Sequence, residues 1–102
     1  MQKFYNFEIT FKVNKIDQTD FLKNLKTIKN ELTNKNVLPI YITLFKNIDK
    51  NKDFFTIYLG FMSDKGFDEW KKNVPQELKN IYNNNLKKYV IKTDHKEQQS
   101  ID

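Results

Sequence analysis

The opening segment of the sequence alternates in residue character, and this alternation constrains the fold more than any other feature. Within residues 3–13 one face would carry Tyr5, Phe7, Ile9, Phe11 and Val13. The opposite face would carry Phe4, Asn6, Glu8, Thr10 and Lys12. Because successive side chains of a strand point to opposite faces, a period of two predicts a half-buried β-strand.

In the segments that follow, the spacing of the apolar residues changes from a period of two to about 3.6 and then returns to two. After Asp17, a plausible N-cap, apolar side chains recur at helical spacing: Phe21, Leu22, Leu25, Ile28 and Leu32. Residues 38–48 and 54–62 alternate again, which predicts two strands joined by a hairpin loop at 49–53. The order so far is strand, helix, strand, strand.

The segment "GFDEWKKNVPQELKNIY" contains the only tryptophan and a proline inside a helical pattern. Pro75 cannot continue a helix but is favourable at the start of a new one, so we expect two short helices that meet near Pro75. A last strand is predicted over 87–93. The order β-α-β-β-α-β predicts an α+β fold, the ferredoxin-like plait, with a four-stranded antiparallel sheet and helices on one face. We expect one domain over residues 1–93 and a polar, disordered tail over 94–102.

Composition limits the classes of function. The chain has 102 residues and no cysteine, which excludes disulfides, thiolate nucleophiles and cysteine metal sites. Its net charge is +5, but all 18 basic residues are lysines, so the arginine fork that reads guanine and clamps phosphate is absent. No apolar run is long enough to span a bilayer. These features predict a cytoplasmic protein that is not primarily a nucleic-acid binder.

The second face of the predicted sheet is also rich in apolar groups. Its candidates are Phe4, Tyr41, Phe45, Phe54, Tyr58 and Met62. A sheet face with so many large apolar side chains is normally covered. We therefore expect a homodimer in which two copies pack their sheets face to face.

The strand "FTIYLGFMSD" followed by "FDEWKKNVPQELKNIY" resembles the antibiotic biosynthesis monooxygenase family. In that family a strand leads through a short acidic or serine turn into a helix that bears a tryptophan, a break with a proline, and a second helical segment. The resemblance implies a dimeric α+β barrel. It also implies an oxidoreductase that oxidises polycyclic or quinol-like aromatic molecules with molecular oxygen and without a cofactor, in a dry cavity between sheet and helices.

The resemblance supplies the candidate site residues. By position in the family pattern it implies Asn6 and Trp70 as catalytic residues. The substrate-binding walls would be Tyr58, Phe67, Trp70 and Tyr82. Glu8 would serve as the general base if its face of the strand were buried and its pKa raised. From the residue pattern alone, we prefer a simple core position on an amphipathic helix for Trp70 over a catalytic role.

The haem-degrading branch of the family uses a histidine ligand a little beyond that tryptophan. This sequence has Asn80, Ile81 and Tyr82 there, and its one histidine, His95, lies near the end of the chain. We therefore expect no haem, although a tyrosinate from Tyr82 stays open as an iron ligand.

Two alternatives of other classes remain. The same plait could form a dimeric interaction module without catalysis. The exposed sheet face could also stack single-stranded nucleic-acid bases on Phe4, Phe54 and Tyr58. Whether the protein turns over a bound molecule is left open by the sequence.

Overall fold

The structure is a computed structural model and describes residues 3–48 and 53–101. The predicted loop at 49–53 lies, apart from Asp53, outside the described residues. The main elements, in chain order, are β1 (Lys3–Lys12), α1 (Gln18–Asn34), β2 (Tyr41–Lys46), β3 (Phe54–Phe61), α2 (Asp64–Asn73), α3 (Gln76–Ile81) and β4 (Val90–Gln99). A π-helical turn (Tyr82–Leu86) and a 3-10 turn (Lys87–Tyr89) join α3 to β4.

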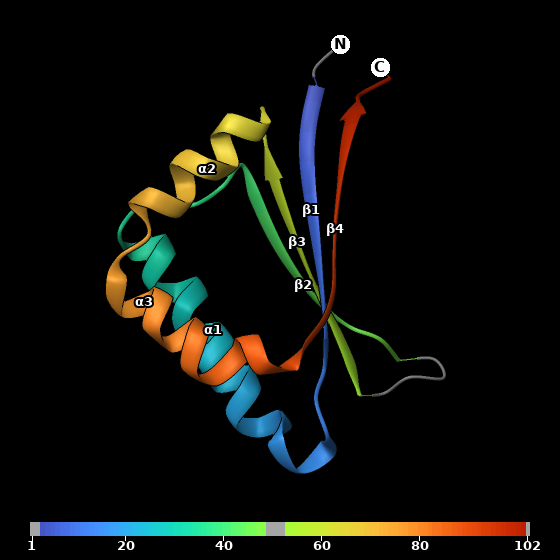
Figure 1. The fold of residues 1–102 in the computed structure, drawn as a ribbon, viewed down its shortest axis with the longest axis vertical. Helices are drawn as coiled ribbons and strands as arrows, with labels where there is room; N and C mark the ends of the chain where they lie inside the picture. Colours follow the sequence, from blue (N-terminus) through green and yellow to red (C-terminus); the bar gives the residue numbers. More distant parts are fainter. Residues whose placement is uncertain (1–2, 49–52, 102) are drawn as a thin grey trace.

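The described strands form one antiparallel sheet of four strands in the order β2-β3-β1-β4. The helices lie together on one face of this sheet, and the other face carries no element (Figure 1). This arrangement is the predicted ferredoxin-like plait, so the predicted fold class is confirmed. We refer to the uncovered side of the sheet as the back face.

The core lies between the sheet and the helices and combines phenylalanine rings with aliphatic side chains. Its most completely buried side chains are Phe11, Val13, Phe21, Leu32 and Leu86. The ring of Phe21 lies 5.1 Å from that of Phe11 and 5.3 Å from that of Phe55, so β1, α1 and β3 meet at this ring. Each fully buried side chain of this kind contributes about 1.5–3 kcal/mol.

The second helical region is divided at Pro75, as the sequence predicts. The α2 helix begins after Ser63, whose Oγ accepts a hydrogen bond from the amide of Gly66 at 3.2 Å. It ends at Asn73, after which Val74 and Pro75 are extended with ψ of 127° and 143°. The α3 helix restarts at Gln76 and directs the chain back over α1 (Figure 1).

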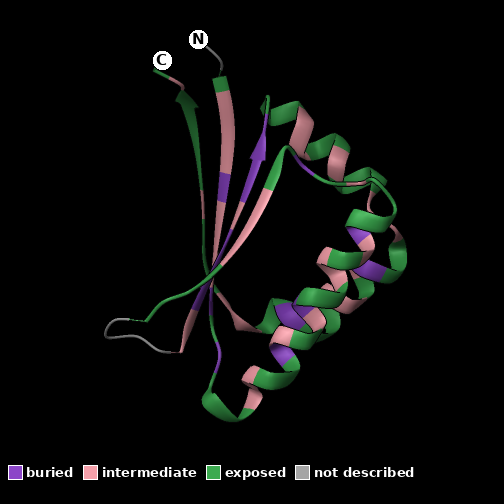
Figure 2. Cartoon of the chain, turned by 180° about the vertical axis from the view of Figure 1, so that it is seen from behind, coloured by how far each residue is buried: buried purple, intermediate pink, exposed green. Residues whose placement is uncertain are grey.

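The structure corrects two predicted strand boundaries and one helix cap. β2 is shorter than the predicted strand over 38–48. β4 begins later than predicted but continues to Gln99, so residues 94–99 are not the disordered tail that we expected. They pair with β1 through the backbone, up to Lys3 opposite Gln99, while most of these residues are exposed (Figure 2). Asp17 stands at the N-cap position of α1, but its side chain makes no capping hydrogen bond.

Candidate functional site

A cavity of about 780 Å³ lies between the sheet and the helices. We refer to it as the helix–sheet cavity. Its sheet side is formed by Ile9, Ile42, Leu44, Ile57 and Leu59. Its helix side is formed by α1, α2 and α3, with Leu25, Ile28, Leu32, Val74 and Leu78 among the apolar contributors. The family resemblance implied a cavity between the sheet and the helices, and the structure has a mainly apolar one there.

Trp70 forms part of the cavity wall in a fixed orientation. Its indole Nε1 donates a hydrogen bond to the backbone carbonyl of Val37 at 2.6 Å. Its ring centroid lies 5.6 Å from that of Phe61. The indole is therefore held by the connection before β2 and by β3, and it presents a rigid aromatic surface to the cavity.

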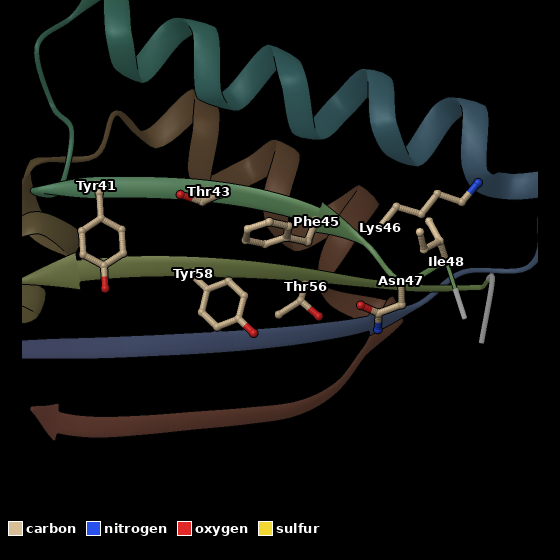
Figure 3. Close-up of a pocket in the computed structure, with 8 residues that line it drawn as sticks. All are labelled: Tyr41, Thr43, Phe45, Lys46, Asn47, Ile48, Thr56 and Tyr58. Carbon is tan, nitrogen blue, oxygen red and sulfur yellow. The ribbon is translucent and has the colours of Figure 1, made fainter. Parts of the chain in front are cut away.

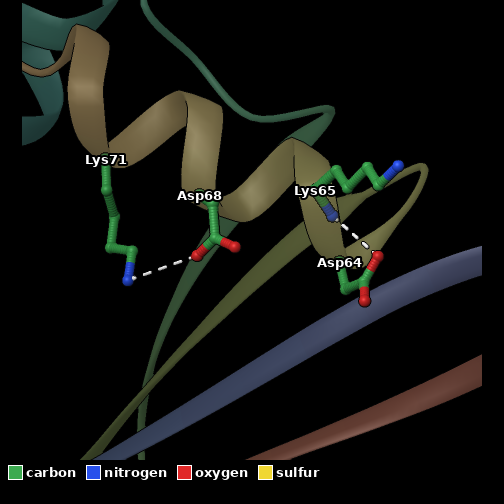
Figure 4. A network of polar contacts seen from close by, with 4 residues as sticks. All are labelled: Asp64, Lys65, Asp68 and Lys71. Atoms are coloured by element: carbon green, nitrogen blue, oxygen red, sulfur yellow. Dashed lines mark hydrogen bonds and ion pairs between the residues drawn. The ribbon is translucent and has the colours of Figure 1, made fainter.

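Phe67 lies one turn before Trp70 on α2 and also lines the cavity. Its ring stacks on Phe7 of β1, with centroids 3.9 Å apart and planes at 20°. The ammonium of Lys71 lies 4.6 Å from the centroid of the Phe67 ring, and it also forms an ion pair with Asp68 at 3.5 Å (Figure 4). Aromatic and charged groups therefore adjoin along this edge of the cavity.

Tyr82 lines the cavity from the start of the π-helical turn. Burial raises the pKa of its phenol above the ordinary value of 10.0, so the hydroxyl stays neutral at physiological pH. Within residues 3–48 and 53–101, its hydroxyl has no hydrogen-bond partner. It can therefore donate a hydrogen bond to a molecule in the cavity.

Asn6 lies on the back face, away from the cavity. Its amide nitrogen donates to Gln98 Oε1 at 2.5 Å, and its amide oxygen accepts a hydrogen bond from the Tyr41 hydroxyl. The three side chains form a polar row from β2 across β1 to β4. The ring of Tyr41 crosses β3 over Gly60, which has no side chain in its way (Figure 3).

Tyr58 and Glu8 also lie on the back face. The Tyr58 hydroxyl donates to Glu8 Oε1 at 3.5 Å, at the limit of hydrogen-bond distance, and its ring meets that of Phe45 edge to face at 5.5 Å. Desolvation by burial raises the pKa of Tyr58, and the negative charge and hydrogen bond of Glu8 raise it further. The structure thus brings Phe67, Trp70 and Tyr82 together and places Asn6, Glu8 and Tyr58 on the other side of the sheet.

The back face has a depression of its own. It has a volume of about 590 Å³ and lies over β2 and β3 (Figure 3). Its aromatic and aliphatic lining side chains are Tyr41, Phe45, Ile48 and Tyr58. Phe45 is 52% exposed, so this depression is an open, partly apolar surface rather than an enclosed site.

Sequence reasoning missed the polar residues of the helix–sheet cavity. Its lining includes Lys29, Lys72, Lys79 and Asn83, in addition to the Asp68–Lys71 pair. The signal was present in the helical spacing, because Lys29 lies four residues after Leu25 on the buried side of α1. Lysines between the apolar positions of a helix are typical of a solvent-exposed face, so residue type alone does not distinguish Lys29 from them.

Comparisons with known proteins show which solved structures share this fold. No protein-family model matches the chain, and no curated protein matches its sequence. Solved structures do match it. A NIPSNAP-like domain protein from Burkholderia xenovorans aligns with a TM-score of 0.69 at 7% identity, over 96% of this chain and 85% of its own.

A "Putative antibiotic biosynthesis monooxygenase" from Bordetella bronchiseptica aligns with a TM-score of 0.67 at 8% identity, over 98% of this chain and 99% of its own. A dimeric ferredoxin-like protein from an uncultured marine organism aligns with a TM-score of 0.67 at 16% identity, over 100% of this chain and 94% of its own. The predicted resemblance is therefore confirmed at the level of the fold. In the part of the chain that the structure describes, no helix has both the length and the hydrophobicity to cross a membrane.

Proposed function

We propose that the protein binds an apolar aromatic small molecule in the helix–sheet cavity. The observation that carries this proposal is the cavity itself, with Phe67, Trp70 and Tyr82 in its walls. Its volume of about 780 Å³ lies in the range that is usual for small-molecule sites. Its walls are mainly apolar with a few polar groups, which is the usual composition of such a site.

The polar groups of the cavity favour binding over a defined reaction. The carboxylate among the lining residues is that of Asp68, which is paired with Lys71. Glu8, the predicted general base, lies on the back face beside Tyr58. Oxidation of a quinol-like aromatic molecule by molecular oxygen remains a prediction from the family resemblance, and we propose the binding of such a molecule.

Trp70 provides a direct test, because it is the chain's only tryptophan and lines the cavity. Titration with 1,4-naphthoquinone should quench its fluorescence saturably, with one molecule bound per chain. Quenching that rises linearly to the solubility limit of the quinone, as free collisions produce, would refute the proposal.

A matched pair of tyrosine variants tests the position of the bound molecule. Tyr82→Phe should weaken binding of the quinone about three- to tenfold, because it removes a hydrogen bond to a carbonyl oxygen worth about 1 kcal/mol. Tyr58→Phe makes the same chemical change on the back face and should leave affinity unchanged. Equal losses in both variants would contradict the assignment of the site.

We further propose that two copies associate through their back faces. Phe45 is 52% exposed and Tyr41 37%, and both line the back-face depression together with Tyr58; exposed apolar surface of this kind is normally covered. The marine neighbour of the same fold is described as dimeric. Such a pairing would also cover Phe4, Phe54 and Tyr58, which the nucleic-acid alternative requires to be accessible.

Light scattering after gel filtration would measure the mass of the assembly. The wild type should elute with the mass of two chains, and Phe45→Glu should shift it toward one. Ile16→Glu introduces the same charge at a 90% exposed position away from the back face and should leave the dimer intact. A monomeric wild type that binds single-stranded DNA in a salt-dependent manner would favour the nucleic-acid alternative instead.

A further inference from the structure

The walls of the helix–sheet cavity carry an excess of positive charge. Four lysines line it, namely Lys29 from α1, Lys71 and Lys72 from α2, and Lys79 from α3. The lining carboxylate that opposes them is Asp68. An apolar ligand without charge would gain nothing from this distribution.

Most of this charge is not neutralised by the protein. Asp68 pairs with Lys71 at 3.5 Å. In the described part of the chain, Lys29, Lys72 and Lys79 form no ion pair. Lys29 and Lys79 are also half-buried, as expected for side chains whose aliphatic stems lie along the cavity wall.

We propose that the ligand of this cavity is an amphiphile, with an apolar body and one anionic group that lies among Lys29, Lys72 and Lys79. The inference rests on the proposed function, because it specifies what the same cavity binds. The apolar body would contact the sheet-side residues Ile42, Leu44 and Leu59 and the indole of Trp70. The neutral hydroxyl of Tyr82 can donate a hydrogen bond to the anionic group or to an oxygen next to it.

A pair of fluorescent probes separates charge from hydrophobicity. 1-Anilinonaphthalene-8-sulfonate and N-phenyl-1-naphthylamine share an aromatic body, and the first carries a sulfonate. Energy transfer from Trp70 reports binding close to the cavity. We expect the anionic probe to bind at least about tenfold more tightly than the neutral one, and the difference to shrink as salt is raised.

The outcomes distinguish this inference from the proposed function. Equal affinities for the two probes would overturn the anion preference and leave the cavity as a site for apolar molecules. No energy transfer from Trp70 with either probe would overturn both.

A charge-reversal pair on α1 tests which lysines are responsible. Lys29→Glu should weaken the anionic probe about tenfold or more and leave the neutral probe unchanged. Lys23→Glu changes the net charge by the same amount at an exposed position on the same helix, outside the cavity lining. Circular dichroism confirms that both variants fold. Equal weakening by the two variants would assign the preference to overall charge and refute the role of the cavity lysines.

Discussion

Gly60→Ala should destabilise the protein because the ring of Tyr41 occupies the space above Gly60. The two residues are direct cross-strand partners on β2 and β3. A Cβ atom built on Gly60 would lie 2.5 Å from Cζ of Tyr41 and still closer to two other ring atoms. The ring would have to swing away from the sheet, and its hydroxyl would leave Asn6.

The size of the effect follows from what the ring covers. Tyr41 is 37% exposed, so roughly two thirds of the ~200 Å² that an aromatic side chain can bury is lost to solvent if it swings out fully. At about 25 cal/mol per Å² this is at most about 3 kcal/mol, plus about 1 kcal/mol for the hydrogen bond. Two effects reduce this loss. A displaced ring recovers part of its contacts, and replacing glycine by alanine stabilises the protein by about 0.4–1 kcal/mol because it lowers the conformational entropy of the unfolded chain. We expect a net loss of about 1–2 kcal/mol.

Urea unfolding followed by Trp70 fluorescence, at one fixed protein concentration, would measure this loss. With a slope of about 1–2 kcal/mol per M, the midpoint should fall by about 1 M. The decisive comparison is made in a Tyr41→Ala background. There the added Gly60→Ala should be neutral or slightly stabilising, since no ring remains to be displaced. An equal loss in both backgrounds would refute the reasoning.

Two further predictions concern the core and the cavity. Leu86→Ala, at a 0% exposed core position, should lower the free energy of unfolding by about 2–5 kcal/mol. Ile91→Ala, at a 54% exposed position, should lower it by about 0.5 kcal/mol or less. Similar losses for the two variants in thermal or urea unfolding would contradict the placement of the core. Because burial raises the pKa of Tyr82 above 10.0, the folded protein holds the phenol proton more tightly than the unfolded chain, so the stability present below pH 10 is lost as pH rises above it. Urea midpoints measured on both sides of pH 10 should therefore fall more steeply for the wild type than for Tyr82→Phe, and parallel curves would contradict the prediction.

The order of the elements could be predicted because the two periodicities are strong in this sequence. Phe7 and Phe11 on β1 and Ile57 and Leu59 on β3 all reach the buried face that alternation assigns to them. Pro75 marked the break between α2 and α3 because its ring and missing amide act locally. Both effects depend on residues close together in the sequence, so tertiary packing does not override them.

The second half of β4 could not be predicted because its sequence has no apolar periodicity. Residues 94–99 are polar and mostly exposed, so neither face of the strand carries an apolar pattern. They are held by backbone hydrogen bonds to β1, about 90 positions earlier in the sequence, as in the pairing of Tyr5 with Glu97. Backbone hydrogen bonds of this kind do not require particular side chains, so the residue types do not indicate them.

The candidate site was predictable only in part. The family resemblance implied Phe67, Trp70 and Tyr82 as walls of a cavity, and all three line the helix–sheet cavity. Asn6 was a candidate catalytic residue because of its position in the family pattern. The alternation of β1, however, places it on the face opposite Phe7. The position of a cavity depends on how α1 and α3 pack over the sheet, which the sequence determines only through tertiary contacts.

The pairing of β1 with β4 determines how the molecule would respond to mechanical load. The two strands are antiparallel, and Lys3 and Gln99 are opposite each other, so the two ends of the described chain emerge side by side (Figure 1). A force that separates these ends acts along the interstrand hydrogen bonds and breaks them one pair after another, like a zipper. The protein should therefore yield at low force by peeling β4 from the edge of the sheet, while the aromatic cluster around Phe21 is still intact.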